Sequence, residues 1–466
     1  MKSTSTGRPP STPTSSPRAE DRAFKPLSQQ FAEQKAKKAG RRVKGEYGLL
    51  ERQVLSLVER ERVDELARST GFTQRTPKQL PPFPFAICCA LAAAVEERRG
   101  FATVWRLLAA AAGIEVARSA VTQRFGKGSA EFLKALFLEA LPKVPVVEHP
   151  ELLGKLEDFT AVLADDGSVL RLKPLLAKLF PGTRTNHTQA AAKLHAQADI
   201  IHRRIVRVVV TGERDSEREV ARQDPIQPGA LYIRDLGYTN YDDFADIVEG
   251  GGHLLMRLKD DANPTVVRVR HGIRRPMQST GIKLNDVKFT SSRDTFDVDA
   301  EFKTKRHGSI VLRVVGEYNR ETDKYHCYLS TLPPEDFTVE ELSNLYSLRW
   351  VIELLFKFLK SSCHLDHLET SDPDAVRTHL YASLLAATIM YAIAVAAAQA
   401  AGIHPSEISI LSVGIAAPML VIPLLLLWLR RKLSYDELAA LVLRTVAVGC
   451  RNQNPGRTRI QWGALT

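Results

Sequence analysis

One segment of 16 residues, 345–360, limits the folds open to this chain more than any other. Its sequence, LYSLRWVIELLFKFLK, has Leu, Ile, Val or Phe at most positions, so a helix formed by it must be buried over most of its surface. At about 100° per residue, its tyrosine and charged side chains share an arc of roughly 60°, with Lys357 at the border: Tyr346, Arg349, Glu353 and Lys360. The segment therefore predicts a core helix with a narrow ionic stripe.

This stripe has two explanations. Arg349 and Glu353 are four residues apart, as in a structural salt bridge along a helix. However, one carboxylate among three cations leaves excess positive charge in apolar surroundings, and that charge requires an external anion. The net charge of the chain, +11, also favours a polyanionic partner, either nucleic acid or an anionic membrane face.

Hydrophobic patterning indicates several regions in the 466 residues, enough for two to four domains. Helical periodicity precedes residue 150 and returns from about Val339. Between them, short apolar or alternating runs with helical segments such as Tyr241–Glu249 are typical of a mixed α/β region. Residues 264–320 alternate with a β period and hold 12 Lys or Arg and six acidic residues, which predicts a basic all-β insertion. The other expected strands are Phe159–Ala164, Ala191–Ile200, Ile205–Thr211, Ala230–Arg234 and His253–Lys259.

The stripe residues form a recognisable pattern. Tyr346-x2-Arg349-x3-Glu353-x6-Lys360 resembles the YREK signature of bacterial insertion-sequence transposases in the DDE, ribonuclease-H-like superfamily, and the resemblance spans roughly residues 100–400. It implies an α/β, ribonuclease-H-like catalytic core (a mixed sheet flanked by helices) with an all-β insertion and helical N- and C-terminal regions. The implied cytoplasmic location, at the bacterial nucleoid, agrees with five scattered cysteines that show no disulfide framework.

The resemblance implies two further catalytic carboxylates, one on the first core strand and one after the fourth. Asp166, in Asp165-Asp166-Gly167-Ser168 after the first expected strand, fits the first motif, with its neighbour Asp165 as a rival. Asp235, directly after Ala230–Arg234, fits the second. The 118 positions from Asp235 to Glu353 would contain the β insertion.

These carboxylates suit phosphodiester chemistry with two Mg²⁺ ions, for which Mn²⁺ would substitute. By resemblance, Asp166, Asp235 and Glu353 hold the metals. The expected contacts to DNA phosphates are Tyr346, Arg349, Lys357 and Lys360. The sequence contains no Gly-rich phosphate loop, so it does not indicate the use of ATP. His364 and His367 lack neighbouring partners for a zinc site.

The resulting domain prediction has six parts. They are a disordered tail rich in Ser, Thr and Pro (1–27), a helical DNA-binding region (28–150), two parts of the catalytic core (151–262 and 335–400), the β insertion (263–334) and a helical C-terminal region (401–466), a candidate for dimerisation. Two stretches in the N-terminal region resemble helix-turn-helix units, Asp64–Gly71 and Leu107–Phe125.

The function expected is a homodimeric DNA transposase that binds terminal repeats, cleaves there and joins the ends to target DNA. A general two-metal nuclease and a DNA-binding relative without transposition activity remain alternatives. So does a membrane protein, because Leu380–Ser406 and Ile408–Leu429 lack charged residues and Arg430–Lys432 could anchor them. Gly402 and Pro405 predict a helix end between the stretches, and Pro418 and Pro423 are expected to break the second into shorter pieces.

Overall fold

The computed structural model describes residues 45–429, except 75–78, 96–100, 145–153, 184–188, 202–203, 291–293, 364, 366–367 and 369, together with 434–436, 439 and 443. Residues 46–466 form one compact unit, to which nearly all of these described residues belong. The expected tail at residues 1–27, the histidines 364 and 367 and the basic run 430–432 lie outside the described residues.

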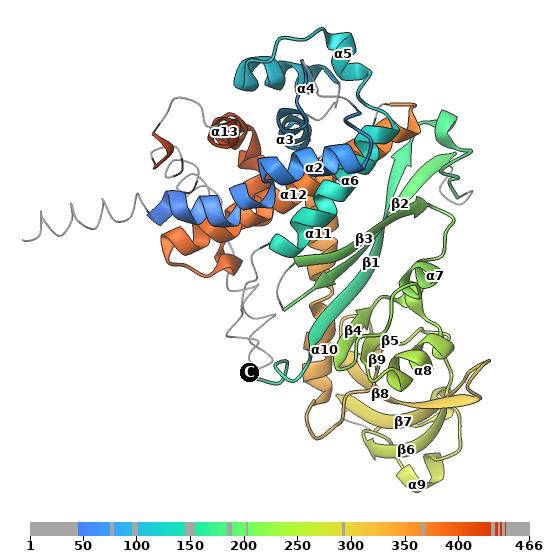
Figure 1. Cartoon of the computed structure of the whole chain (residues 1–466). Coiled ribbons are helices and arrows are strands. Elements are labelled where there is room, and N and C mark those ends of the chain that lie inside the picture. Colours follow the sequence, from blue (N-terminus) through green and yellow to red (C-terminus); the bar gives the residue numbers. More distant parts are fainter. Residues whose placement is uncertain are drawn as a thin grey trace, which may run out of the picture. The chain divides into compact units, whose positions relative to one another are not determined.

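A mixed sheet of nine strands organises the described part of the chain (Figure 1). Its order is β3-β2-β1-β4-β5-β9-β8-β7-β6, in which β1, β4 and β5 are parallel and every other neighbouring pair is antiparallel. The strands are β1 (Ala161–Leu172), β2 (Ala190–Asp199), β3 (Arg204–Gly212), β4 (Ala230–Arg234), β5 (His253–Arg257), β6 (Thr265–His271), β7 (Thr295–Lys303), β8 (Ser309–Asn319) and β9 (Lys324–Ser330).

β1 is longer than expected. The predicted strand ended at Ala164, with Asp165 and Asp166 after it, but β1 continues to Leu172 and contains both. The reason is its neighbour β2, which pairs with β1 from Leu163 to Leu172, whereas β4 pairs with it only as far as Asp165. Long-range pairing of this kind leaves no local sign in the sequence.

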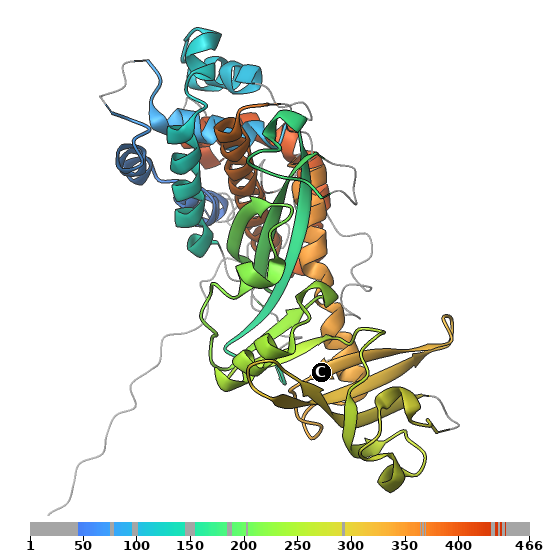
Figure 2. The same ribbon diagram turned by 90° about the vertical axis from the view of Figure 1, so that its right-hand side faces the viewer.

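The expected basic β insertion corresponds to strands β6–β9. These strands continue the same sheet, because β9 pairs with β5 through Leu255 and Ser330 and the other three follow in order (Figure 2). A short helix α9 (Pro276–Ser279) lies between β6 and β7 in the sequence.

The two faces of the central strands carry different cores. Val162 and Ala164 of β1 pack with the helices α10 (Val339–Ser347) and α11 (Trp350–Ser361), whereas Ala161 and Leu163 pack with α8 (Tyr241–Glu249). Successive side chains of a strand point to opposite faces. The position of each polar residue along β1 thus determines whether its side chain faces α10 and α11.

α12 (Pro373–Ala401) is the core helix of the N- and C-terminal regions, and it contacts α3, α6, α11 and α13. The helices around it and beside it are α2 (Arg60–Ser69), α3 (Pro82–Ala92), α4 (Phe101–Leu107), α5 (Arg118–Thr122), α6 (Lys127–Ala140) and α13 (Ile410–Leu429). α12 and α13 are long and apolar enough to cross a membrane, but 94% of the most apolar window of α12 is buried inside the protein, against 50% for α13. α12 ends at Ala401, before Ile408 as Gly402 and Pro405 predicted, and Gly402 takes the left-handed conformation.

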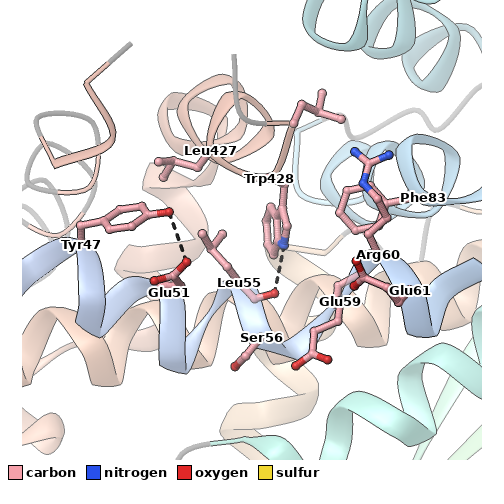
Figure 3. A pocket seen from close by; sticks show the side chains of 12 residues that line it. Tyr47, Glu51, Leu55, Ser56, Glu59, Arg60, Glu61, Phe83, Leu427 and Trp428 are labelled. Atoms are coloured by element: carbon pink, nitrogen blue, oxygen red, sulfur yellow. Dashed lines mark hydrogen bonds between the residues drawn. The ribbon is translucent and has the colours of Figure 1, made fainter. Parts of the chain in front are cut away.

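The expectation that prolines break the last apolar stretch is wrong. α13 is one helix with Pro418 and Pro423 inside it. Each proline removes one helical hydrogen bond, but the buried residues around them, among them Leu420 and Leu424, keep the helix packed against the core. At its end, Trp428 donates from Nε1 to the Leu55 carbonyl (3.3 Å) and faces a pocket of about 350 Å³ (Figure 3).

The two helix-turn-helix candidates differ in the structure. After the first, the next helix is α3, whose eleven residues are all buried, so it presents no surface to DNA and the first candidate is wrong. In the second, a π-helical turn ends at Gly113 in the left-handed conformation and α5 follows. Arg118, Ser119 and Gln123 are exposed there, so this candidate retains a surface that could contact DNA.

Candidate active site

The parallel pairing of β1 with β4 brings two of the predicted acidic residues together. The register pairs Asp165 with Arg234, which makes Asp166 and Asp235 the next residues along the two strands. Asp166 shares the face of Val162 and Ala164, which packs against α10 and α11. Asp235 follows β4 on the corresponding face, since Leu231 and Ile233 belong to the same core.

Asp165 lies on the opposite face and is committed to other partners. Its Oδ2 accepts a hydrogen bond from Arg234 Nε (2.8 Å), and its Oδ1 accepts one from Gln197 Nε2 (2.9 Å). Asp165 and Arg234 are both buried, so they form an internal ion pair that joins β1 to β4. The geometry thus favours Asp166 over Asp165 as the acidic residue of the site.

Asp166 lies among the other carboxylates. Its Oδ1 accepts a hydrogen bond from the Gly167 N–H (2.8 Å), and its Oδ2 is 3.6 Å from Arg349 Nη1. The pKa of Asp166 is raised to about 6, mainly by burial and also by the negative charges of Asp235 and Glu353, against the lowering effects of the Gly167 N–H and Arg349. Asp166, Asp235 and Glu353 therefore lie within electrostatic range of one another.

The helix that supplies Glu353 is interrupted where the sequence predicts one continuous helix. α10 ends at Ser347 and α11 begins at Trp350, with hydrogen bonds between residues three apart at Leu348 N–H and Arg349 N–H. Such a tight turn aligns side chains at positions i and i+3, and it brings Tyr346 beside Arg349, whose guanidinium carbon lies 5.7 Å from the ring centroid. The helical wheel therefore identified the right face, but not the break.

Arg349 connects the acidic residues across this turn. Its Nη2 donates to Glu353 Oε1 (2.6 Å), and its Nη1 faces Asp166. Burial lowers the pKa of Arg349, but Tyr346, Glu353 and Asp235 together raise it above its usual value. The cation is thus held in the protonated form beside at least two carboxylates.

The remaining predicted contacts also lie on this segment. Tyr346 is half-buried against Tyr328, with ring centroids 5.2 Å apart, and burial raises its pKa to about 12, so its hydroxyl keeps its proton at neutral pH. Lys357 is exposed, and Lys360 is partly buried two turns beyond Glu353. The structure thus brings Asp166, Asp235, Glu353, Arg349 and Tyr346 together and places the two lysines further along α11.

Sequence reasoning missed Glu217, which lies beside both acidic motifs. It is in α7 (Glu217–Ala221), in the connection from β3 to β4. A Cβ atom added at Gly167 would lie 2.8 Å from Glu217 Oε1, and one added at Gly237 would lie 2.9 Å from Oε2. The sequence contained one sign of this neighbour, because a glycine follows each aspartate within two residues. Those glycines were interpreted only as parts of the acidic motifs.

The chemical character of the site fits divalent cations. Carboxylate oxygens are the protein ligands that Mg²⁺ and Mn²⁺ prefer. The raised pKa of Asp166 reflects both burial and the neighbouring negative charge of Asp235 and Glu353, and a divalent cation would offset that repulsion. Asp166, Asp235 and Glu353 are the residues that could hold it.

Comparison with known families identifies the domain in which these residues lie. Residues 157–389, half of the chain, match the family described as transposase DDE domain. The chain belongs to this family. The matched region begins just before β1 and ends within α12, so it includes all three acidic residues and strands β6–β9. The predicted family is therefore confirmed, while the four-residue YREK signature stays a prediction.

Individual transposases are similar over a longer region. The transposase for insertion sequence element IS231C of Bacillus thuringiensis subsp. berliner is 25% identical over 363 residues, which are 70% of this chain and 75% of that protein. The transposase for insertion sequence element IS231F of Bacillus thuringiensis subsp. israelensis is 24% identical over 364 residues, with the same coverage. The similarity thus extends well beyond the 157–389 match.

Proposed function

We propose that this DDE family member is the transposase of an insertion sequence, which binds the terminal repeats of its element, cleaves the DNA there and transfers the 3′ ends into target DNA. The observation that carries the proposal is the convergence of Asp166, Asp235 and Glu353 from two parallel strands and a helix. The similarity to proteins named as insertion-sequence transposases, over most of their length, supports it.

In this proposal, strands β1–β5 with α10–α12 form a ribonuclease-H-like core. Asp166, Asp235 and Glu353 hold two Mg²⁺ ions, or Mn²⁺ in their place. When bound, such ions activate the attacking oxygen and stabilise the leaving oxygen of the phosphodiester.

The protein's own contribution is to orient the DNA strand at these acidic residues. Tyr346 keeps its proton at neutral pH and can donate it in a hydrogen bond to a phosphate oxygen. Arg349 offers a planar pair of donors to phosphate, and Lys357 and Lys360 supply positive charge along α11. No step in this role requires ATP.

Two other surfaces suit the DNA that extends away from the site. Strands β6–β8 lie within the basic sequence of residues 264–320, and α5 exposes Arg118, Ser119 and Gln123. Both would act on the backbone or the base edges of the terminal repeat. We further propose that the protein works as a homodimer on two DNA ends, in the bacterial cytoplasm.

The test is cleavage of a plasmid that carries the DNA flanking this gene, with Mg²⁺ or Mn²⁺. Wild type is compared with Glu353→Gln and Asp235→Asn, each shown to be folded and to bind the DNA. We expect cleavage at the flanks by wild type and a loss of at least about 1000-fold in both variants, since each removes a group required for transition-state stabilisation. Joining of the cut ends to a second plasmid separates a transposase from a nuclease.

Equal activity of all three proteins would contradict the assigned carboxylates. Absence of cleavage by wild type with intact DNA binding would instead indicate a DNA-binding relative that no longer moves DNA.

A further inference from the structure

Glu217 contacts the backbone of both acidic motifs, and no part of the proposed chemistry accounts for it. Its two carboxylate oxygens divide between the motifs, since Oε1 faces Gly167, next to Asp166, and Oε2 faces Gly237, two residues after Asp235. The inference drawn from this contact rests on the proposed function.

The glycines at these positions are explained by space. Neither Gly167 nor Gly237 has a positive φ, so the backbone at each is open to any residue. At 2.8 and 2.9 Å, however, an added Cβ would come too close to the Glu217 oxygens, so the flexible end of the Glu217 side chain would have to shift away. The absence of a side chain at both glycines therefore makes room for one carboxylate.

The carboxylate is held in place by its own element and by the sheet. Glu217 lies at the start of α7, and its Oε1 is 3.4 Å from Lys193 Nζ on β2. Lys193 also donates to the Asp215 carbonyl (3.2 Å), which fixes it against the same connection. The side chain of Glu217 is only 26% exposed, so solvent does not compete freely for it.

Tyr238 lies close to the same acidic residues. Burial raises the pKa of its hydroxyl, and Asp165, Glu217 and Asp166 raise it further. Glu217 thus lies within electrostatic range of the same tyrosine as Asp165 and Asp166. Among the described residues, β1 pairs with β4 only as far as Asp165.

We propose that Glu217 is a positioning residue that sets the spacing between Asp166 and Asp235 by packing against Gly167 and Gly237 at once. β1 and β4 stop pairing at Asp165 and Arg234, one residue before the two aspartates. The Glu217 carboxylate bridges the two chains just past that point, where backbone hydrogen bonds between them have ended. It acts through the aspartates and is not itself a ligand in this proposal.

The test uses the full chain bound to DNA of the element's end and two readouts. One is the affinity for Mn²⁺, measured by electron paramagnetic resonance; the other is the Mg²⁺ concentration that gives half-maximal cleavage. For Glu217→Ala and for Gly167→Ala, we expect Mn²⁺ to bind about 10- to 100-fold more weakly, the range found when residues behind metal ligands are changed. DNA affinity without metal and the melting temperature should change little.

Double substitution distinguishes positioning from general damage. In the Glu217→Ala background, the methyl group of Gly167→Ala or of Gly237→Ala enters vacated space, so each should add almost nothing to the loss. Glu217→Gln should restore most of the Mn²⁺ affinity, because the amide fills the same volume. The matched control is Glu219→Gln, an exposed acid of the same helix, which should behave as wild type.

Two results would overturn the inference. One is a loss of Mn²⁺ affinity from Gly167→Ala that is as large in the Glu217→Ala background as in wild type. The other is Mn²⁺ binding by Glu217→Ala that is as tight as in wild type. The proposed function fails separately, if Glu353→Gln and Asp235→Asn bind Mn²⁺ and cleave as wild type does.

Discussion

At the scale of single residues, the adjacent acids Asp165 and Asp166 have opposite environments. One is paired with a buried arginine, whereas the other has a raised pKa among carboxylates. Strand alternation alone produces this difference, because neighbouring side chains of β1 point to different cores. Two conservative substitutions, one position apart, should therefore have different effects.

Asp165→Asn should lower the free energy of unfolding by about 3 kcal/mol, because it leaves the charge of Arg234 buried without a counterion. Asp166→Asn should leave that free energy unchanged or raise it slightly, since burial and its neighbours disfavour the ionised carboxylate, but it should abolish cleavage. Urea unfolding without metal, followed by the plasmid assay, measures both. The reverse pattern would make Asp165 the functional acid.

Arg349 holds a position that a bound cation would also favour, between Asp166 and Glu353. We expect Arg349→Gln to strengthen Mn²⁺ binding by the DNA-free protein and to weaken cleavage. Each 1.4 kcal/mol by which Arg349 disfavours the bound cation corresponds to about a 10-fold change in Mn²⁺ affinity. Isothermal titration with Mn²⁺ measures the first effect, with Arg377→Gln as a control because its partner Asp374 lies on the surface of α12. Weaker Mn²⁺ binding by the variant would refute this competition.

The site could be predicted from sequence as far as local periodicity reaches. The wheel of residues 345–360 gave Tyr346, Arg349 and Glu353 one face, and the family resemblance then selected Asp235, which follows strand 230–234 in the structure. Glu217 could not be found this way, because its relation to Gly167 and Gly237 depends on the packing of α7 against segments some 20 to 50 residues away.

At the scale of elements, the end of α12 depends on one backbone conformation. Gly402 has a φ of 67°, and an added Cβ would meet no atom of the described residues within 4 Å, so Gly402→Ala tests the left-handed conformation without a clash. We expect it to lower the free energy of unfolding by about 1 kcal/mol. Gly126→Ala, which has equal space and a negative φ, is the control and should cost less in the same urea titration.

β2 contains a histidine that should make stability depend on pH. Burial, with the charges of Lys193 and Arg207, lowers the pKa of His195 to about 4, and its Nδ1 has no hydrogen-bond partner among the described residues. An unfolded histidine titrates near pH 6.5, so between pH 6.5 and 4 the unfolded chain binds more protons. The contribution of neutral His195 is therefore complete above pH 6.5 and is lost as the pH falls towards 4.

His195→Gln should accordingly show a smaller loss of stability over this interval, by about 1 to 3 kcal/mol. Urea unfolding at pH 7, 5.5 and 4.5 measures it, with wild type as the reference for all other titrating groups. If the free energy of unfolding fell equally with pH in the two proteins, His195 would not be held neutral.

At the scale of the whole molecule, the two apolar helices differ in what covers them. Ile389 of α12 is 0% exposed, whereas Ile415 of α13 is 79% exposed. Ile389→Asp should unfold the protein or cost more than about 4 kcal/mol, because it buries an unpaired charge. Ile415→Asp should change stability by less than about 0.5 kcal/mol.

Thermal unfolding of both variants, purified without detergent, checks this contrast. If both helices crossed a membrane, wild type would require detergent, and each aspartate would impair insertion to a similar degree.

The architecture was predictable in its order of elements and less so in their connections. Four of the core strands and helix 241–249 fall close to their expected positions. The extension of β1 to Leu172 and the continuity of α13 through two prolines were not foreseen, because both depend on neighbours distant in sequence. Secondary-structure propensity and hydrophobic periodicity depend only on residues that are close together in the sequence.

The continuous sheet also has a defined width across its strands. From β5 to β6 there are four strand intervals, or about 19 Å at the usual spacing of about 4.8 Å. Along B-form DNA, this length corresponds to about five or six base pairs. If the DNA of the proposed complex runs across these strands, a member of the family with one hairpin fewer should protect about three base pairs less beyond the cut.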